Sequence, residues 1–427
     1  MATNEKSMLT RRFIYSNIFI FPLITMFFSL QTTVAGKVIA LLPAVITISL
    51  SVAQILSEIL KNKVFKLIFK DLKLNFFLMT CLVFFGCTIF QSDKGLAALS
   101  RLVFLLYAFS LLFFIKRFKT NSSKNYSIET LFVGLTFLIN LNFTLYVMGI
   151  TNDSAVIMKA SILTNLGFDI DRVFFFFSYG VNSYGPLAGL SLLAAIFLYK
   201  VKKGFLWKSY SFFSIQFSLL SILLIDSRGV IAICIFSLIF IFLGKFFVRN
   251  RLFSIIIFMI PFLFLLNPLI DLLIMLLPSR GNFYDGENLS MRLFYWTSIL
   301  DYYFTATDHQ IILGNHLFFI PDDFLVYAEN NDFGADATFI TVHNTVLQLF
   351  IQMGLIGLLA FMMFVREFSL KFVNQKNFTL PNLINLAMCI FILGLGNGES
   401  LFTPSILAFP IFVLFFFSAL IYKQELK

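Results

Sequence analysis

The sequence predicts an all-α membrane protein, a polytopic bundle of about twelve transmembrane helices with one large loop on the outer side of the membrane. Hydrophobic residues make up 59% of the 427-residue chain and charged residues only 13%, whereas a soluble chain is about one quarter charged. The mean hydropathy is +0.90. Apolar runs long enough to cross a bilayer core of about 30 Å recur along nearly the whole chain. A soluble enzyme is therefore excluded.

Each apolar run is bounded by charged residues or by Gly and Pro breaks and predicts one membrane helix. The twelve runs are 13–30, 37–60, 74–91, 98–115, 127–149, 173–199, 208–226, 229–247, 252–275, 343–365, 382–396 and 405–422. The first run follows Arg11 and Arg12, as a signal peptide would, but no small-residue cleavage site closes it, so we expect a retained helix.

These runs divide the chain into helices one to nine (1–276), a large outer loop (277–342) and helices ten to twelve (343–427). Loops of this length are uncommon in compact folds unless they are functional. Within the loop, apolar residues at helical spacing predict a short helix over 289–305 that lies along the outer surface. The loop carries nine acidic residues and two basic ones, Arg280 and Arg292.

The distribution of basic residues predicts the orientation, because Lys and Arg are retained on the cytoplasmic side during insertion. Of the 32 basic residues, 24 lie in the alternate segments that include both ends of the chain. We therefore expect the N- and C-termini in the cytoplasm and the large loop in the periplasm. The net charge of +10 follows from this topology and does not indicate nucleic-acid binding, since no basic patch with interleaved aromatics is present.

Arg228 closely follows the seventh run, in the sequence LLIDSRG. A tight turn there leads directly into the eighth run. An arginine this close to the membrane core usually faces a bundle interior or a polar cavity. Its planar guanidinium suits phosphate oxygens, so we expect an anion ligand. An interfacial arginine paired with Asp226 is the alternative.

Arg280 and Arg292 stand in the acidic outer loop, and Arg292 lies on the predicted surface helix beside the aromatic residues 294–296. Because the loop as a whole repels phosphate, we expect both arginines to serve as substrate ligands. Contact of Arg292 with lipid headgroups is the alternative.

His343 opens the tenth run in TVHNTVLQ, at the junction of the outer loop and the membrane. Asn344, Gln348 and Gln352 follow at a spacing of four and predict a polar stripe along one helix face. We expect His343 to act as a base or hydrogen-bond partner for a sugar hydroxyl, with Asn344 and Gln348 holding the glycan. A helix cap is the alternative for the histidine.

Arg172 directly precedes the sixth run, which is interrupted by Gly180, Asn182, Gly185 and Pro186. Polar and helix-breaking residues at membrane depth are tolerated where they line a cavity. Arg172 and Asn182 are therefore predicted to bind substrate, although helix packing and a kink would explain the same pattern.

Metal, cofactor and nucleotide sites are not indicated. His309 and His316 lie near Asp308, Asp322 and Asp323, but no HExxH or comparable spacing appears. We predict no metal site and no cofactor. The absence of a G-x-x-x-x-G-K-[ST] phosphate loop argues against ATP-driven transport.

In topology and in several short motifs, the chain resembles the bacterial O-antigen polymerase (Wzy) and O-antigen ligase (WaaL) superfamily. The motifs fall in the same order and on the same side of the membrane. They are Ser227-Arg228-Gly229, Met291-Arg292 with Trp296, Leu313-Gly314-Asn315, His343-Asn344 and Gly354-Leu355-Ile356-Gly357.

This resemblance implies a GT-C-like glycosyltransferase of the bacterial inner membrane that acts at the periplasmic face. Its partners would be an undecaprenyl-diphosphate-linked glycan donor, a glycan acceptor and membrane lipids, with a chain-length regulator left open. Arg228 and Arg292 would bind the diphosphate, and His343 would lie beside the reacting hydroxyl.

Within this superfamily we expect a polymerase of O-antigen repeat units. Many ligases have a carboxylate or a second histidine close to the His-Asn pair, and the sequence VHNTVLQ has neither. An O-antigen ligase that transfers glycan to lipid A-core is the alternative. A lipid-linked oligosaccharide flippase is a third reading, which the scarcity of charge along the spans disfavours.

Overall fold

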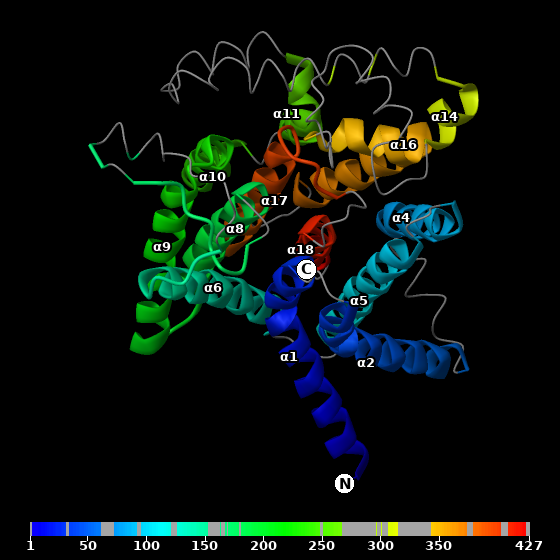
Figure 1. The fold of residues 1–427 in the computed structure, drawn as a ribbon, viewed down its shortest axis with the longest axis horizontal. Coiled ribbons are helices and arrows are strands. Elements are labelled where there is room, and N and C mark those ends of the chain that lie inside the picture. Colours follow the sequence, from blue (N-terminus) through cyan, green and yellow to red (C-terminus); the bar gives the residue numbers. More distant parts are fainter. Residues whose placement is uncertain are drawn as a thin grey trace.

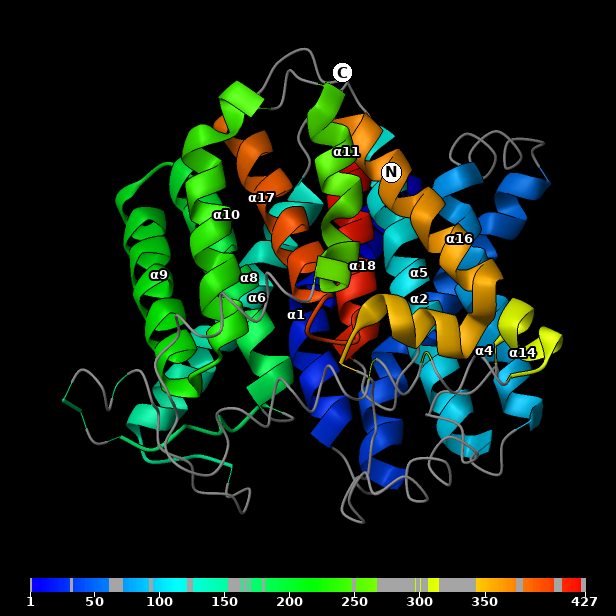
Figure 2. The same cartoon turned by 90° about the horizontal axis from the view of Figure 1, so that it is seen from above.

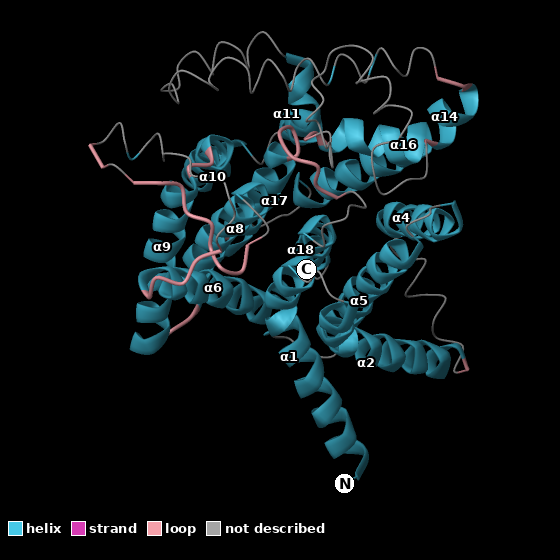
Figure 3. Ribbon diagram, viewed as in Figure 1, coloured by secondary structure: helices cyan, strands magenta, loops and turns pink. Residues whose placement is uncertain are grey.

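The computed structural model describes residues 2–30, 34–60, 72–91, 95–120, 126–152, 163, 167–168, 170–178, 181–247, 251–266, 296, 300, 306–314, 343–373, 379–402 and 409–423. Every regular element within these ranges is a helix, apart from one isolated bridge between Thr151 and Phe175. Figure 3 shows the described chain as helices joined by loops. The predicted all-α class is confirmed for this part of the chain.

The helices of the first half are α1 (Ala2–Leu30), α2 (Val34–Ile59), α4 (Leu72–Gln91), α5 (Gly95–Thr120), α6 (Tyr126–Val147), α8 (Val181–Val201) and α9 (Phe205–Ile225). Those of the second half are α10 (Arg228–Phe247), α11 (Arg251–Met259) with the 3-10 helix η1 (Ile260–Leu266), α14 (Asp308–Leu313), α16 (Thr345–Val373), α17 (Leu380–Leu395) and α18 (Phe409–Lys423). Figure 1 shows them gathered into one bundle.

Seven of the described helices are long and apolar enough to cross a membrane. They contain Leu9–Leu30, Ala35–Ser57, Leu99–Phe118, Ser127–Val147, Ser183–Val201, Phe205–Ile225 and Thr345–Leu370. Four shorter apolar helices cover Arg228–Gly244, Leu252–Leu263, Leu380–Leu395 and Phe409–Ile421. A multi-pass membrane protein is therefore supported, and each predicted run overlaps a described helix. That all twelve cross the membrane stays a prediction.

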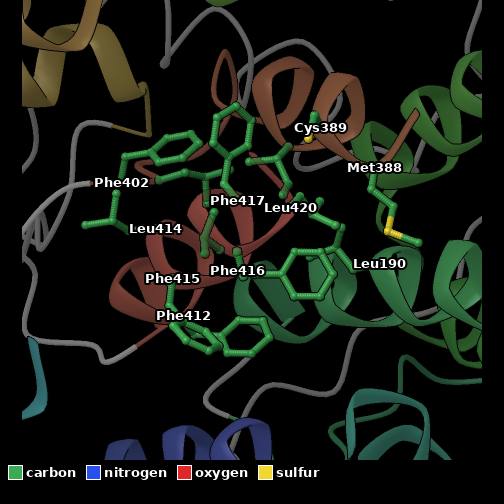
Figure 4. Close-up of a cluster of buried hydrophobic side chains, with 14 of the residues drawn as sticks. Leu190, Met388, Cys389, Phe402, Phe412, Leu414, Phe415, Phe416, Phe417 and Leu420 are labelled. Atoms are coloured by element: carbon green, nitrogen blue, oxygen red, sulfur yellow. The ribbon is translucent and has the colours of Figure 1, made fainter. Parts of the chain in front are cut away.

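Helix α18 lies at the centre of the bundle. Its side chains from Ile411 to Ile421 are buried on every face, as expected of a helix that is apolar all round. Phe415 meets Phe21 of α1 with ring centroids 4.5 Å apart, and Phe417 meets Phe402 at 5.1 Å. Figure 4 shows this cluster of phenylalanines around α18. The rings fill the space between helices that are distant in the sequence.

The predicted start of the sixth span, at residue 173, is wrong. Residues 170–178 have no helical turns, and α8 begins only at Val181. The backbone of this segment bonds outside a helix, since Val173 N–H donates to Leu224 at 3.0 Å and Phe174 accepts from Asn152 at 3.0 Å. Asn142 binds the N–H and the carbonyl of Phe177. An apolar run beside the membrane can remain extended when neighbours satisfy its polar groups.

Two predicted spans are interrupted. Helix α16 has a non-helical residue, Gly354, with φ 59° and ψ −158°, and Figure 2 shows its first part turned across the direction of its second part. Helix α11 changes to the 3-10 form at Ile260, immediately before Pro261, which lacks a backbone N–H. The breaks lie in the two predicted spans that flank the outer loop.

The two chain ends lie toward the same end of the bundle in Figure 2. Helix α9 runs from that end of the bundle to its turn with α10, which lies at the opposite end. At about 1.5 Å per residue, its 21 residues cover the thickness of a bilayer core. The α9–α10 turn and the chain ends therefore lie on opposite faces.

Candidate functional site

The α9–α10 turn consists of two residues, Asp226 and Ser227, and is shorter than the tight turn over Asp226 to Gly229 that the sequence predicts. Asp226 adopts the left-handed conformation with φ 53°, and its N–H bonds to Leu223. The carbonyl of Ser227 accepts from Ile231 at 3.0 Å, so α10 begins directly at Arg228. Asp226 is fully buried and Arg228 half-buried. The arginine therefore lies at the rim of the bundle.

Helix α8 packs closely on this turn through Gly185. A Cβ atom at this position would lie 3.2 Å from the Cβ of Ser227 and 3.2 Å from the Cγ2 of Val230. Of the readings that the sequence allows for this interruption, a cavity, a kink or helix packing, Gly185 fits helix packing. Asn182 lies in the first turn of α8, and its substrate contact stays a prediction.

Arg172 lies beside the same turn. Its Nε donates to the carbonyl of Ile225 at 2.8 Å, and Arg228 follows three residues after that carbonyl. The extended segment 170–178 therefore brings Arg172 to the turn that carries Arg228. Two guanidinium groups at one turn are an arrangement suited to phosphate oxygens.

His343 precedes α16 and faces a carboxylate. Its Nδ1 lies 3.2 Å from the Oε2 of Glu399, and the side chains keep 31% and 19% of their exposure. His343 has φ 53°, a left-handed conformation that is unusual for a residue other than glycine. The pair is thus partly buried but still reachable from outside.

Thr345 of α16 fixes the segment around Glu399 through three hydrogen bonds. Thr345 N–H donates to Gly396 at 2.8 Å. The Thr345 hydroxyl donates to the carbonyl of Glu399 at 2.9 Å and accepts from Leu401 N–H at 2.8 Å. These bonds hold the backbone of Glu399, from which its carboxylate extends toward His343.

The two amides predicted to hold a glycan are engaged inside the protein. Asn344 caps α16 by accepting from Leu347 N–H at 3.0 Å and donates to the carbonyl of Asn397 at 3.3 Å. Gln348 accepts from the Ser400 hydroxyl at 3.3 Å. Asn344, Gln348 and Gln352 are all buried. In this structure the predicted polar stripe binds the segment 396–401 rather than facing outward.

Asn397 joins the segment 396–401 to the end of α11. Its Nδ2 donates to the carbonyl of Ile260 at 2.8 Å, at the point where α11 becomes η1. Ile260 lies in the predicted ninth span, and His343 directly follows the outer loop. The turn that carries Glu399 is therefore bonded to both spans that flank the loop.

The packing of α10 on α17 places the arginines at the same end of the bundle as the histidine. The two helices are antiparallel, because a Cβ at Gly394 would lie 3.2 Å from Ile233 and a Cβ at Gly244 would lie 3.2 Å from Leu383. Arg228 is five residues from Ile233, and Glu399 is five residues from Gly394. The start of α10 and the Glu399 turn consequently share one face.

The backbones of α14 and α16 cross at two glycines. A Cβ at Gly314 would lie 2.6 Å from Gly354 N, and a Cβ at Gly354 would lie 2.4 Å from the carbonyl of Ile312. Both glycines have positive φ, 70° and 59°. Thr307 and Gln310 form a capping box at the start of α14. A segment of the outer loop is thereby fixed on the kink of α16.

Two predicted site residues, Arg280 and Arg292, lie outside the described residues, and so does His316. Of the predicted surface helix over 289–305, Trp296 and Leu300 are described as helical, and Trp296 is buried. His309 is exposed on α14. No group of three or more His, Cys, Asp or Glu side chains that could hold a metal ion occurs in the described part of the chain.

Sequence reasoning missed Glu399, Asn397 and Thr345. A signal was present, since the polar sequence Asn397 to Ser400 interrupts two apolar runs at the end of the bundle predicted to face the periplasm. No protein-family model matches this chain, and no curated protein matches it either. Its function is therefore inferred from its residues, their geometry and the sequence resemblance.

Proposed function

We propose that the protein is a membrane glycosyltransferase that polymerises undecaprenyl-diphosphate-linked O-antigen repeat units at the periplasmic face of the inner membrane. The observation that carries this proposal is the His343–Glu399 pair, partly buried at the end of the bundle where Arg172 bonds to the turn that precedes Arg228. A base and two phosphate ligands on one face are what transfer from a lipid diphosphate requires. The family itself is inferred from the sequence resemblance.

The pair supplies an oriented base. An ionised carboxylate only accepts hydrogen bonds, so contact with Glu399 places the imidazole proton on Nδ1. The Nε2 of His343 then carries the lone pair and can take a proton from an acceptor hydroxyl. The Glu399 carboxylate stabilises the imidazolium that forms.

In the proposed transfer step, one bond forms and one bond breaks. The acceptor hydroxyl oxygen attacks C1 of the donor sugar, the bond from C1 to the diphosphate oxygen breaks, and the hydroxyl proton passes to His343. The lipid diphosphate leaves with the bonding electrons. Arg228 and Arg172, with Arg292 as the resemblance implies, stabilise charge on the leaving oxygens. The enzyme otherwise contributes mainly by orienting two glycans.

The ligase is a second candidate, favoured by one observation. The sequence around His343 has no carboxylate or second histidine, and this absence favours a polymerase over a ligase. Glu399 provides a carboxylate to His343 from 56 residues away. This ground for preferring the polymerase is therefore weakened, although the polymerase remains our proposal.

A flippase would be expected to line its path with charge. Among the described residues whose burial is known, Arg101 and Asp226 are the fully buried charged side chains. The hydrogen-bonded side chains of His343, Glu399, Asn344 and Gln348 lie together at one end of the bundle. This distribution supports an enzyme that acts at one face.

The glycan pattern of a deletion strain tests the proposal. Core carrying a single repeat unit is expected for a lost polymerase. Naked core with accumulating lipid-linked polymer would instead indicate a ligase, and single units trapped in the cytoplasm would indicate a flippase. An unchanged glycan pattern would overturn all three.

A further inference from the structure

The turn between α8 and α9, at the opposite end of α9 from Arg228, combines exposed lysines with exposed apolar side chains. Its sequence is YKVKKGFLWK, residues 199–208. Gly204 has φ 96° and allows the sharp reversal between the helices. Phe205 and Leu206 retain 82% and 81% of their exposure. Nothing in this turn belongs to the proposed active site.

Two of the four lysines are bound within the protein. Lys202 forms an ion pair with Glu129 of α6 and lies over the ring of Trp207 at 5.3 Å. Lys208 donates to the carbonyl of Tyr199 and lies 4.3 Å from the centre of its ring. These contacts fix the shape of the turn.

The other two lysines, Lys200 and Lys203, are exposed on either side of the bound Lys202. The carboxylate of Glu129 is already paired with Lys202. The turn therefore presents two positive charges to its surroundings, directly beside two exposed apolar side chains.

Its aromatic residues place this turn at the boundary between membrane and water. Trp and Tyr are enriched at that level because their rings are apolar and their N–H or O–H is polar, and both Trp207 and Tyr199 are partly exposed here. Phe205 and Leu206 suit the acyl boundary. Lysine side chains extend their apolar stems along such a surface and hold the ammonium group at the headgroups.

We propose that the α8–α9 turn binds the phosphate headgroup of anionic phospholipids in the leaflet on the side of the chain termini, through Lys200 and Lys203. Each lysine near an anionic membrane surface contributes about 1 kcal/mol, which is about a fivefold change in affinity. A soluble acidic protein fits less well, because it would leave Phe205 and Leu206 without an apolar environment.

Trp207 is a built-in probe for this contact, since the chain has two tryptophans and Trp296→Phe leaves Trp207 alone. The full chain carrying Trp296→Phe is reconstituted in phosphatidylcholine vesicles that contain brominated phosphatidylglycerol or brominated phosphatidylcholine at equal mole fraction. We expect stronger quenching of Trp207 by the brominated phosphatidylglycerol, with a preference that falls as salt rises.

The double variant Lys200→Gln/Lys203→Gln should remove this preference, and Lys200→Arg/Lys203→Arg should retain it. Lys37→Gln, in the first turn of α2, removes one charge elsewhere and should leave it unchanged. Equal quenching by both lipids, persistence of the preference in the double Gln variant, or its loss in Lys37→Gln would overturn the proposal. Circular dichroism checks that each variant keeps its helices, and no readout depends on glycosyltransferase activity.

Discussion

The Nδ1 of His343 lies 3.2 Å from the Oε2 of Glu399, which follows it by 56 residues and comes from the turn after α17. A histidine oriented by a carboxylate is a recurring arrangement for a general base, because the carboxylate fixes the tautomer and stabilises the protonated ring. Neither residue could do this without the segment 396–401 being held on α16.

Glu399→Gln should lower kcat by about 10²-fold or more, within the range that positioned acid–base groups contribute, with a smaller change in KM. The amide is nearly isosteric but cannot stabilise the imidazolium. Polymer formation by the purified protein in proteoliposomes is the measurement. Glu399→Asp should recover part of the rate, and Glu367→Gln on α16 should have no effect. Full activity of Glu399→Gln would show that the pair is only structural.

Arg228→Lys should lose at least about 10² in kcat, the usual effect of removing one group that stabilises transition-state charge. An ammonium keeps the charge but cannot present a planar fork to two phosphate oxygens. The length of glycan ladders in a complemented deletion strain reports the loss. Arg366→Lys, on an exposed position of α16, is the matched control. Normal ladders in Arg228→Lys would contradict bidentate binding.

Gly354→Ala should destabilise the protein by about 2–5 kcal/mol, since it adds a penalty of about 1–2 kcal/mol for a side chain at positive φ to an overpacking cost of about 1–3 kcal/mol. Its Cβ would lie 2.4 Å from the carbonyl of Ile312. Thermal unfolding in detergent micelles measures the change. Gly86→Ala, where a Cβ meets nothing within 4 Å, should be neutral. Equal melting of the two variants would mean that the α14–α16 crossing is not tight.

Thr345→Val should cost about 1–3 kcal/mol, because it leaves the buried N–H of Leu401 without its acceptor. It should also reduce transfer activity, since the same hydroxyl holds the backbone of Glu399. Unfolding and transfer assays are made on the same preparation. Thr379→Val is the matched control, because Thr379 is exposed and its side chain makes no cap bond. Loss of stability with unchanged activity would separate Thr345 from the positioning of Glu399.

Much of the helical framework could be predicted from the sequence. The apolar runs overlap described helices because a chain in lipid must satisfy its backbone groups within each helix, and that requirement is local. The tight turn before Arg228 was also predicted, since Asp226 to Gly229 leaves no room for a loop. The start of α8 was predicted wrongly, because residues 173–178 are as apolar as a helix but bond to α6 and α9.

The candidate site was only partly predictable. His343 and Arg228 were identified from their places at span ends, and Arg172 from its position at the start of a run. Their grouping required the structure. The polar stripe of Asn344 and Gln348 was placed on one face correctly, but its hydrogen bonds to the segment 396–401 depend on how α17 and α18 pack.

The sequence by itself determined that this is a helical membrane protein with its candidate polar chemistry at the ends of its spans, because hydropathy and helix formation depend on residues close together in the chain. Only the tertiary structure decided that Glu399 faces His343, that Arg172 joins the turn of Arg228 and that Gly354 bends α16. Each of these depends on contacts between distant segments, which residue type and spacing along the chain do not specify.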